Sequence, residues 1–305
     1  MKRIFSFIIL LAMSISVSQA QIQVLTGIEQ GTYRVLAEDM NKILPSTSEV
    51  INGETKEIPF LDVRTTAGSS INYDLLVDEH NKASVAILQL DILLRNKMVD
   101  MLEGTEKTKD LMVLMPLCIE TIHLVTKEKT EIDSLVDIQG LKVGIGNKAE
   151  GTYYTASYIK DLSKVEFQSK NISTQDVIKP LLFNKVDAFF VVASTPMEML
   201  KIMPTSTGEK FKIVSLENIN GWADQFTKVT IPAGTYSWQT TDVHTYGVPS
   251  VIVVNTAKIT EEEKQALLQW RAIVTENLLE LQTSGHNSWK TANVSQWDPS
   301  LWPQM

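Results

Sequence analysis

The tripeptide Gly-Thr-Tyr occurs twice in the chain, at residues 31–33 and 151–153, and each copy lies where a β-rich run gives way to a helix-like stretch. The first backbone N–H groups of a helix have no partner within it, and the helix end carries partial positive charge, so carboxylates and phosphates bind there. Glycine lets a ligand approach the backbone, and the threonine hydroxyl can donate a hydrogen bond. A third turn, Gly68-Ser69-Ser70, has the same character. We expect the three turns to bind an anionic group, with ordinary helix capping as the alternative for each turn alone.

Polar side chains at the ends of two apolar strands are expected to point toward the same place. Gln89 ends one such strand and Ser194 ends another. Open parallel sheets bind ligands beyond the carboxyl ends of their strands, so these side chains and the three turns should meet in one cleft. Aromatic side chains near the turns would form its walls or else belong to the core. The predicted ligand-binding residues are Gly31, Thr32, Tyr33, Ser69, Ser70 and Gln89 from one half of the chain and Gly151, Thr152, Tyr153, Phe190 and Ser194 from the other.

The sequence carries no motif of a known class of catalytic site. Cys118 is the only cysteine, which excludes an intramolecular disulfide and a cysteine-based metal cluster, and we expect it to be a buried structural thiol. The glycines of residues 144–151 have one residue too many for a dinucleotide-binding motif, and no P-loop lysine follows. We therefore predict no catalytic residue, no metal site and no cofactor. Surface or interface positions without metal-ligand spacing are expected for His80, His123, His244 and His286.

Composition and charge exclude several classes of protein. The chain has 305 residues with 44% hydrophobic and 21% charged side chains, which is typical of a folded protein with about two domains. Its 28 basic and 36 acidic residues give a net charge of −8, and it has no basic cluster beyond Lys2-Arg3. We therefore predict no nucleic-acid partner, and we expect a monomer.

Residues 1–20 have the pattern of a secretory signal peptide. Lys2 and Arg3 precede an apolar run at residues 4–17, and residues 18–20 offer small side chains for cleavage after Ala20. The run is short for a membrane span, so an uncleaved anchor is the weaker alternative. We expect export to the periplasm.

Strand-like and helix-like segments alternate twice along the chain, which indicates an α/β fold with two lobes. Each lobe is expected to hold a mixed, mostly parallel sheet flanked by helices. The first series comprises strands at 23–26, 61–66 and 84–88 with helices at 32–44 and 69–79, and the second comprises strands at 141–145, 166–168 and 187–193 with helices at 151–162 and 173–184.

Two apolar segments are expected to cross between the lobes. Residues 110–127 contain Pro116, which suits a crossing better than a single strand, and residues 243–255 would carry the chain back. The predicted lobes are then 21–122 plus 246–305, and 123–245. Pro180 should break the helix around it. A C-terminal helix at 261–281, with a capping box of Thr260 and Glu263, should pack on the first lobe, and Trp289, Trp297 and Trp302 would pin the tail or else contact a ligand.

Seven segments together resemble one family of transport proteins. They span nearly the whole chain after residue 20, and the Ile231–Tyr236 segment is the most specific. The segments are Leu25–Tyr33, Thr66–Asn72, Val85–Gln89, Gly144–Tyr153, Val186–Phe190, Ile231–Tyr236 and Asp242–Val248. In these segments the chain resembles the TAXI-type solute-binding proteins of TRAP transporters.

The resemblance implies a two-lobed periplasmic-binding-protein fold, type II-like, that closes on a small organic solute. It also implies a carboxylate or amino acid such as glutamate as ligand, and delivery to the membrane permease subunits of a sodium-driven TRAP transporter. The first turn departs from the glycine-rich family pattern with Ile28, Glu29 and Gln30, and Glu29 would repel an anion or cap the helix. A ligand sensor for a membrane receptor, or an enzyme on the same fold, is the alternative.

Overall fold

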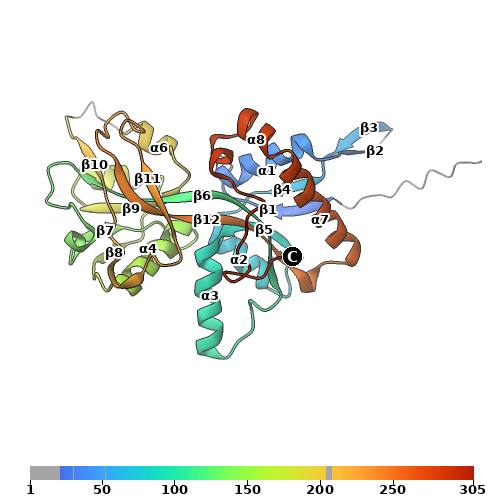
Figure 1. Cartoon of the computed structure of the whole chain (residues 1–305), viewed down its shortest axis with the longest axis horizontal. Helices are drawn as coiled ribbons and strands as arrows, with labels where there is room; N and C mark the ends of the chain where they lie inside the picture. The colour runs from blue at the N-terminus through green and yellow to red at the C-terminus, as the bar shows by residue number, and fades with distance from the viewer. Residues whose placement is uncertain (1–20, 30, 52, 204–207) are drawn as a thin grey trace, which may run out of the picture.

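A computed structural model describes residues 21–29, 31–51, 53–203 and 208–305. The predicted signal peptide, residues 1–20, lies outside the described residues. Within the described part, the chain forms a mixed α/β fold, as predicted, built on one large sheet and one small hairpin. The hairpin, β2 (Thr47–Ile51) and β3 (Glu54–Ile58), projects from the body of the molecule (Figure 1) and was not foreseen from the sequence.

The large sheet runs the length of the molecule. Its strands follow the order β4-β1-β5-β12-β6-β9-β7-β8, with β10 paired to β6 and β11 paired to β12. Strands β1, β4 and β5 are parallel at one end, and β7, β8 and β9 are parallel at the other. The strands are β1 (Ile22–Leu25), β4 (Leu61–Arg64), β5 (Val85–Gln89), β6 (Leu111–Lys127), β7 (Lys142–Gly144), β8 (Gln168–Lys170), β9 (Ala188–Ala193), β10 (Phe211–Val214), β11 (Thr227–Ile231) and β12 (Val243–Asn255).

Helices flank both ends of this sheet. We call the end with β1, β4 and β5 lobe 1, and the end with β7, β8 and β9 lobe 2 (Figure 1). Lobe 1 also carries the C-terminal helices, and short 3₁₀ turns join several elements. The α-helices are α1 (Thr32–Ile43), α2 (Ser69–Val77), α3 (Leu90–Glu103), α4 (Gly151–Ser163), α5 (Ile178–Leu182), α6 (Glu198–Lys201), α7 (Glu261–Glu276) and α8 (Leu278–Ser284), and the 3₁₀ turns are η1 (Leu135–Ile138), η3 (Ile219–Gly221), η4 (Thr256–Lys258) and η5 (Asn287–Thr291).

The two lobes are joined by β6 and β12, which lie antiparallel between them (Figure 1). The segment around Pro116 is one continuous strand of 17 residues, so the expectation that it would not be a single strand was wrong. Register shifts between β6 and β12 flank the pairing of Pro116 with Val251. A proline is tolerated beside such irregularities because the ladder there needs no N–H from it.

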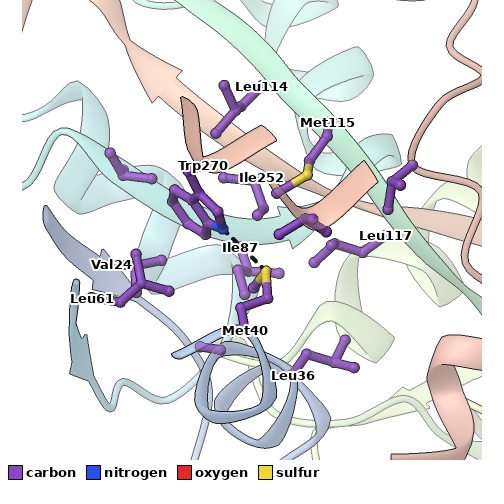
Figure 2. Packing of buried hydrophobic residues seen from close by; sticks show 14 of the residues in the cluster. Val24, Leu36, Met40, Leu61, Ile87, Leu114, Met115, Leu117, Ile252 and Trp270 are labelled. Atoms are coloured by element: carbon purple, nitrogen blue, oxygen red, sulfur yellow. Dashed lines mark hydrogen bonds between the residues drawn. The ribbon is translucent and has the colours of Figure 1, made fainter. Parts of the chain in front are cut away.

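Each lobe has its own hydrophobic core. In lobe 1, α1 and α7 cover the sheet, and fully buried Trp270 of α7 packs among Leu36, Met40 and Ile252 (Figure 2). The Trp270 indole N–H points at the Met40 sulfur, 3.3 Å away. The lobe 2 core includes Tyr246 of β12, a residue that the sequence assigned to lobe 1.

The predicted C-terminal helix packs on lobe 1 but is divided. The capping box is confirmed, since the Thr260 N–H donates to Glu263 at 2.8 Å and the Glu263 N–H donates to the Thr260 hydroxyl at 3.2 Å. Asn277 separates α7 from α8, because its backbone leaves the helical region and its side-chain amide donates to the Ile273 carbonyl. Trp289 and Trp302 are buried in lobe 1, and Trp297 is half-buried beside Trp302.

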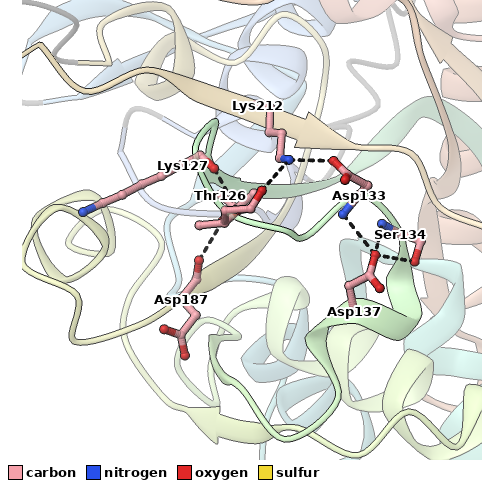
Figure 3. A network of polar contacts seen from close by, with 8 residues as sticks. Thr126, Lys127, Asp133, Ser134, Asp137, Asp187 and Lys212 are labelled. Carbon is pink, nitrogen blue, oxygen red and sulfur yellow. Dashed lines mark hydrogen bonds and ion pairs between the residues drawn. The ribbon is translucent and has the colours of Figure 1, made fainter.

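The second helix predicted in lobe 2 is much shorter than expected. Only Ile178–Leu182 is helical, and Pro180 lies in its first turn, where no backbone N–H needs an intrahelical partner. The far edge of lobe 2 is held instead by polar contacts (Figure 3). Lys212 of β10 donates to Asp133 at 2.6 Å, and the Thr126 hydroxyl donates to the Asp187 carbonyl at 2.8 Å. These contacts fix β10 and β9 against the turn that follows β6.

Candidate functional site

A cavity of about 750 Å³ lies between the two lobes. From lobe 1 it is lined by the first residues of α1 and α2, the last residue of β5 and the start of η5. From lobe 2 it is lined by the first residues of α4 and by the loop that follows β9. Its volume suits a small organic molecule, and its walls come from segments far apart in the sequence.

Most of the predicted ligand-binding residues line this cavity. Their contact with a ligand stays a prediction, but the structure brings them together from both lobes. The residues that line the cavity are Gly31, Thr32, Tyr33, Ser69, Gln89, Gly151, Thr152 and Ser194.

Three of the predicted residues lie elsewhere. Phe190 is fully buried in the lobe 2 core, where its ring lies 6.1 Å from that of Phe167, so it does not form a wall. Tyr153 is half-buried and packs against the same core, outside the cavity lining. The Ser70 hydroxyl lies 3.2 Å from the hydroxyl of Tyr154, outside the cavity lining.

Backbone amides at two helix starts are available to a ligand. In the described part of the chain, the N–H groups of Ser69 and Ser70 in α2 and of Gly151 and Thr152 in α4 have no hydrogen-bond acceptor. The first turn differs in part, because the N–H of its N-cap residue Gly31 donates to the Ile28 carbonyl at 2.8 Å, whereas the N–H of Thr32, the first residue of α1, has no acceptor in the described chain. Each of the three turns therefore offers at least one amide without an acceptor among the described residues, and α2 and α4 offer two each.

Gly151 allows close contact between the lobes. A Cβ atom on Gly151 would lie only 1.6 Å from Oε1 of Gln89, so any other residue there would displace that side chain. Gln89 is 1% exposed, and among the described residues neither its amide nitrogen nor its amide oxygen makes a hydrogen bond of good geometry, although the side chain lies close enough to Glu120 to lower the pKa of that carboxyl. A buried amide without partners is costly to the fold, so this side chain is free to bind a polar group in the cavity.

Glu120 of β6 also lines the cavity and was not singled out from the sequence. It is 6% exposed, and burial raises the pKa of its carboxyl to about 8. The Tyr33 hydroxyl donates to its Oε2 at 3.2 Å and lies 3.1 Å from the Ser69 hydroxyl. Burial first, and the neighbouring Glu120 charge second, raise the pKa of Tyr33 well above its usual value. The one available signal was a lone carboxylate inside an apolar strand.

Two other glutamates border the cavity, and both are already bonded. Glu150 accepts hydrogen bonds from Asn147 at 2.7 Å and Ser173 at 2.9 Å and from the backbone N–H of residue 174 at 3.1 Å. Exposed Glu198 pairs with Lys201. Glu29 lies outside the lining and pairs with Arg34 at 2.8 Å, so it neither caps α1 nor faces the cavity.

Direct contacts across the lobes accompany the cavity. The Thr155 hydroxyl of α4 donates to Asp91 of α3 at 2.6 Å. Burial raises the pKa of Asp91 to about 6. The Arg95 guanidinium lies over the ring of Tyr154, 5.2 Å from its centroid. These contacts join α3 to α4, so the structure shows the lobes closed upon each other.

The histidine and cysteine positions bear on catalysis. His123 was expected at a surface or an interface, but it is fully buried, bonded to the Tyr236 hydroxyl at 3.0 Å, and burial lowers its pKa to about 4. Cys118 is buried as predicted, and burial raises its pKa to about 11, which disfavours the reactive thiolate.

Among the described residues, no three His, Cys, Asp or Glu side chains are grouped to hold a metal ion. In that same part of the chain, no helix is long and apolar enough to span a membrane.

Comparison with known proteins found a matching family and several solved structures with a similar fold. The sequence pattern of the NMT1-like family matches residues 24–295. A Xanthomonas citri protein solved with ATP bound is similar in structure, with a TM-score of 0.53 and 11% identity over 92% of this chain and 93% of that one. The periplasmic binding protein BugD gives a TM-score of 0.51 and 11% identity over 90% and 88% of the two chains.

A binding protein of an import system has the same architecture. The ligand-binding component of an ABC-type import system from Staphylococcus aureus, solved with zinc bound, gives a TM-score of 0.50 and 11% identity. The match covers 92% of this chain and 89% of that one. The chain therefore belongs to the NMT1-like family and has the fold of periplasmic solute-binding proteins.

Proposed function

We propose that this protein is an extracytoplasmic solute-binding subunit that captures a small organic solute in the cavity between its lobes. The observation that carries the proposal is that amides without acceptors and polar side chains from both lobes line one cavity. A solute that contacts both lobes stabilises the closed arrangement only, so occupancy changes the shape that a membrane partner meets. No enzymatic step is part of this function.

The partner that we propose is the permease pair of a TRAP-type secondary transporter. Support comes from the resemblance to TAXI-type proteins, whose most specific segment is Ile231–Tyr236. In the structure, Tyr236 is buried in lobe 2, where its hydroxyl accepts from the Met197 N–H at 3.1 Å. Met197 lines the cavity, so this segment supports the loop that follows β9. We propose that the protein acts as a monomer in the periplasm after removal of residues 1–20.

Binding is tested by isothermal titration of protein that has been unfolded, dialysed and refolded to remove any bound solute. The panel consists of amino acids and dicarboxylates, because both classes suit helix N-termini. We expect at least one member to bind and to lower the radius of gyration measured by X-ray scattering. A mass spectrum of small molecules released from the untreated protein extends the search beyond the panel. Heat from no panel member, together with no released solute, would contradict the proposed function.

A further inference from the structure

The cavity has two sides, because the helices that line it cover opposite faces of the sheet. In lobe 1, α1 belongs to the hydrophobic cluster that contains Val24 of β1, and α2 belongs to the cluster that contains the next residue, Leu25. In lobe 2, α4 shares a cluster with Phe190 of β9, whereas Met199 of α6 packs on the cluster of Phe189. Neighbouring residues of a strand point to opposite faces of a sheet. Figure 1 shows α1 and α6 on one side of β6 and β12, and α2 and α4 on the other.

The side of the cavity formed by α2 and α4 is polar. The backbone N–H groups without acceptors at the starts of these two helices can donate to an oxygen of a ligand. The Gln89 side chain lies against Gly151 of α4, and its buried amide makes no hydrogen bond of good geometry with the described residues. The lining residues on this side include Gly68, Ser69, Asn147, Gly151, Thr152 and Ser173.

The side formed by α1, α6 and the residues that precede them carries large apolar side chains. Two of these are well exposed, Ile28 at 43% and Ile202 at 76%. Single exposed apolar side chains are common, but a group that meets around one cavity from both lobes indicates a surface for an apolar ligand. Methionine side chains adapt to ligands of different shape. The apolar lining residues on this side are Ile28, Val35, Met197, Met199 and Ile202.

The charged side chains around the cavity disfavour an anionic solute. The described lining has no lysine or arginine, whereas it has three glutamates. Glu150 accepts three hydrogen bonds within lobe 2, and exposed Glu198 pairs with Lys201. Burial raises the pKa of Glu120 to about 8 despite a hydrogen bond from Gln89 that lowers it, so this carboxyl is mostly protonated at pH 7. An anion buried beside Glu120 would lack a cationic partner, which is costly.

His286 also lines the cavity, but on the side of α1. Its backbone N–H donates to Asp39 of α1 at 2.7 Å, and its Nδ1 accepts from the Ser288 N–H at 3.2 Å. The residue is exposed, so water solvates a charge on its ring. The amides without acceptors begin α2 and α4, so His286 lies across the cavity from an oxygen bound by them.

We propose that the cavity takes an uncharged amphipathic solute, whose amide or similar carbonyl group lies at the starts of α2 and α4 and whose apolar body lies between α1 and α6. The inference rests on the proposed function and names a substrate class that differs from the carboxylate or amino acid implied by the family resemblance. The carbonyl oxygen would accept from the backbone N–H groups, and an amide N–H would donate to Oε1 of Gln89. Sites for drug-sized ligands span roughly 300–1,000 Å³. The cavity of about 750 Å³ therefore has room for the apolar body.

The decisive experiment compares three solutes by isothermal titration of refolded wild-type protein at pH 7. Hexanoate has the apolar chain of hexanamide but carries a charge, and we expect it to bind about tenfold more weakly or worse. Butanamide lacks two CH₂ groups, each of which contributes about fourfold in affinity when buried, so it should also bind about tenfold more weakly. No heat from hexanamide, hexanoate binding as tightly as hexanamide, or equal affinity for the two amides would overturn the inference.

The solute that the untreated protein carries gives a second readout. A molecule released by unfolding and identified by its mass should be uncharged at pH 7 and should partition from water into octanol. A released solute that is charged at pH 7, or binding of glutamate without heat from hexanamide, would overturn the inference and leave the proposed function intact. No released solute and no binding of any amide, amino acid or dicarboxylate would contradict both.

Variants locate the apolar body. Met199→Gln keeps the length of the side chain but makes it polar, and we expect hexanamide affinity to fall about tenfold. Leu102→Gln, at a position of α3 that is 84% exposed and outside the cavity lining, is the matched control and should bind as the wild type does. If Met199→Gln does not fold, Ile202→Gln decides, because its exposed side chain supports no core, and we expect a loss of about threefold. Unchanged hexanamide affinity in the folded variants would place the apolar body elsewhere and overturn the inference.

Discussion

The two Gly-Thr-Tyr turns share a sequence but have different structures. In the first, the Gly31 amide is used within the turn and the Tyr33 hydroxyl reaches Glu120 in the cavity. In the second, the Gly151 amide is free and Tyr153 packs on the core of lobe 2. Of the two turns, the first therefore contributes the tyrosine side chain and the second contributes the glycine amide. The tripeptide is shifted by one residue relative to the helix, since Gly31 is the N-cap of α1 and Gly151 is the first residue of α4, so identical tripeptides do not make equivalent contributions to a site.

The pH dependence of stability should show the strongest difference between the two turns, because the first contacts Glu120, a carboxyl whose pKa is strongly raised by burial. The pKa of Glu120 rises from 4.5 to about 8 on folding. A group whose pKa is higher in the folded state than in the unfolded state stabilises the folded state. This stabilisation is complete below the pKa of the unfolded state and is lost as the pH rises through the pKa of the folded state. Between about pH 4.5 and 8 we expect the wild type to lose stability relative to Glu120→Gln.

Urea unfolding of both proteins at several pH values measures this difference. His123 titrates near the same range but is present in both proteins and cancels in the comparison. The Asp91 charge contributes to the raised pKa of Glu120, so the difference between the two proteins reports Glu120 together with this interaction. A difference in unfolding free energy that does not change with pH would show that Glu120 ionises normally in the folded protein.

Replacing the glycine of the second turn should impair closure. A Cβ at Gly151 would overlap Gln89 of the opposite lobe, whereas a Cβ at Gly31 would meet the Ile28 carbonyl oxygen of its own turn at 3.0 Å. We expect Gly151→Val to hold the lobes apart and so to weaken solute binding about tenfold or more. A tenfold loss of affinity corresponds to about 1.4 kcal/mol of binding free energy. Titration gives the affinity and X-ray scattering the shape. Asp161→Ala, at an exposed position of the same helix, is the control.

Removing the two tyrosine hydroxyls should have unequal effects. Tyr33→Phe leaves the buried Oε2 of Glu120 without its donor, which costs about 1–3 kcal/mol of unfolding free energy at a pH where the carboxyl is ionised. Tyr153→Phe should change stability little, because no hydrogen bond of the Tyr153 hydroxyl is found within the described part of the chain. Urea denaturation at pH 9 compares them. Equal losses would mean that the turns are more alike than their geometry indicates.

The contact between α3 and α4 should give the smallest effect. Thr155→Val removes the hydroxyl that donates to Asp91, and Thr155→Ser retains it. A single hydrogen bond to a charged group contributes about 1.5–3 kcal/mol, but in an open arrangement of the lobes water would replace this one, so we expect about 1 kcal/mol. Thermal melting of the two variants at pH 7 measures the difference. Identical melting temperatures would show that this bond does not hold the lobes together.

Local signals made much of the fold predictable. Helix starts at Thr32, Ser69 and Gly151 follow from glycine turns next to apolar periodicity, and the structure begins α1, α2 and α4 at those residues. The two crossings could also be located because long apolar runs are uncommon in a chain of short strands. Pro116 led to a wrong prediction that residues 110–127 would not form a single strand. The strand accepts this proline because its pairing with β12, more than 130 residues away in the sequence, shifts register there.

The side-chain content of the cavity was harder to predict. Glu120 looks like any residue of an apolar strand until the neighbours of β6 are known, and its importance comes from burial between two lobes. The roles of Tyr33 and Tyr153 could not be separated because helix position alone does not decide which side of a helix faces a cleft. Phe190 and Ser70 were assigned to the site by proximity in sequence, yet they project away from it.

The continuous sheet has a consequence for how the molecule denatures. Because β6 and β12 contribute core residues to both lobes, neither lobe can lose its structure without exposing part of the hydrophobic interior of the other. The molecule should therefore melt in a single calorimetric transition despite its bilobal form. Either lobe expressed as a separate fragment would expose unpaired strand edges and should aggregate.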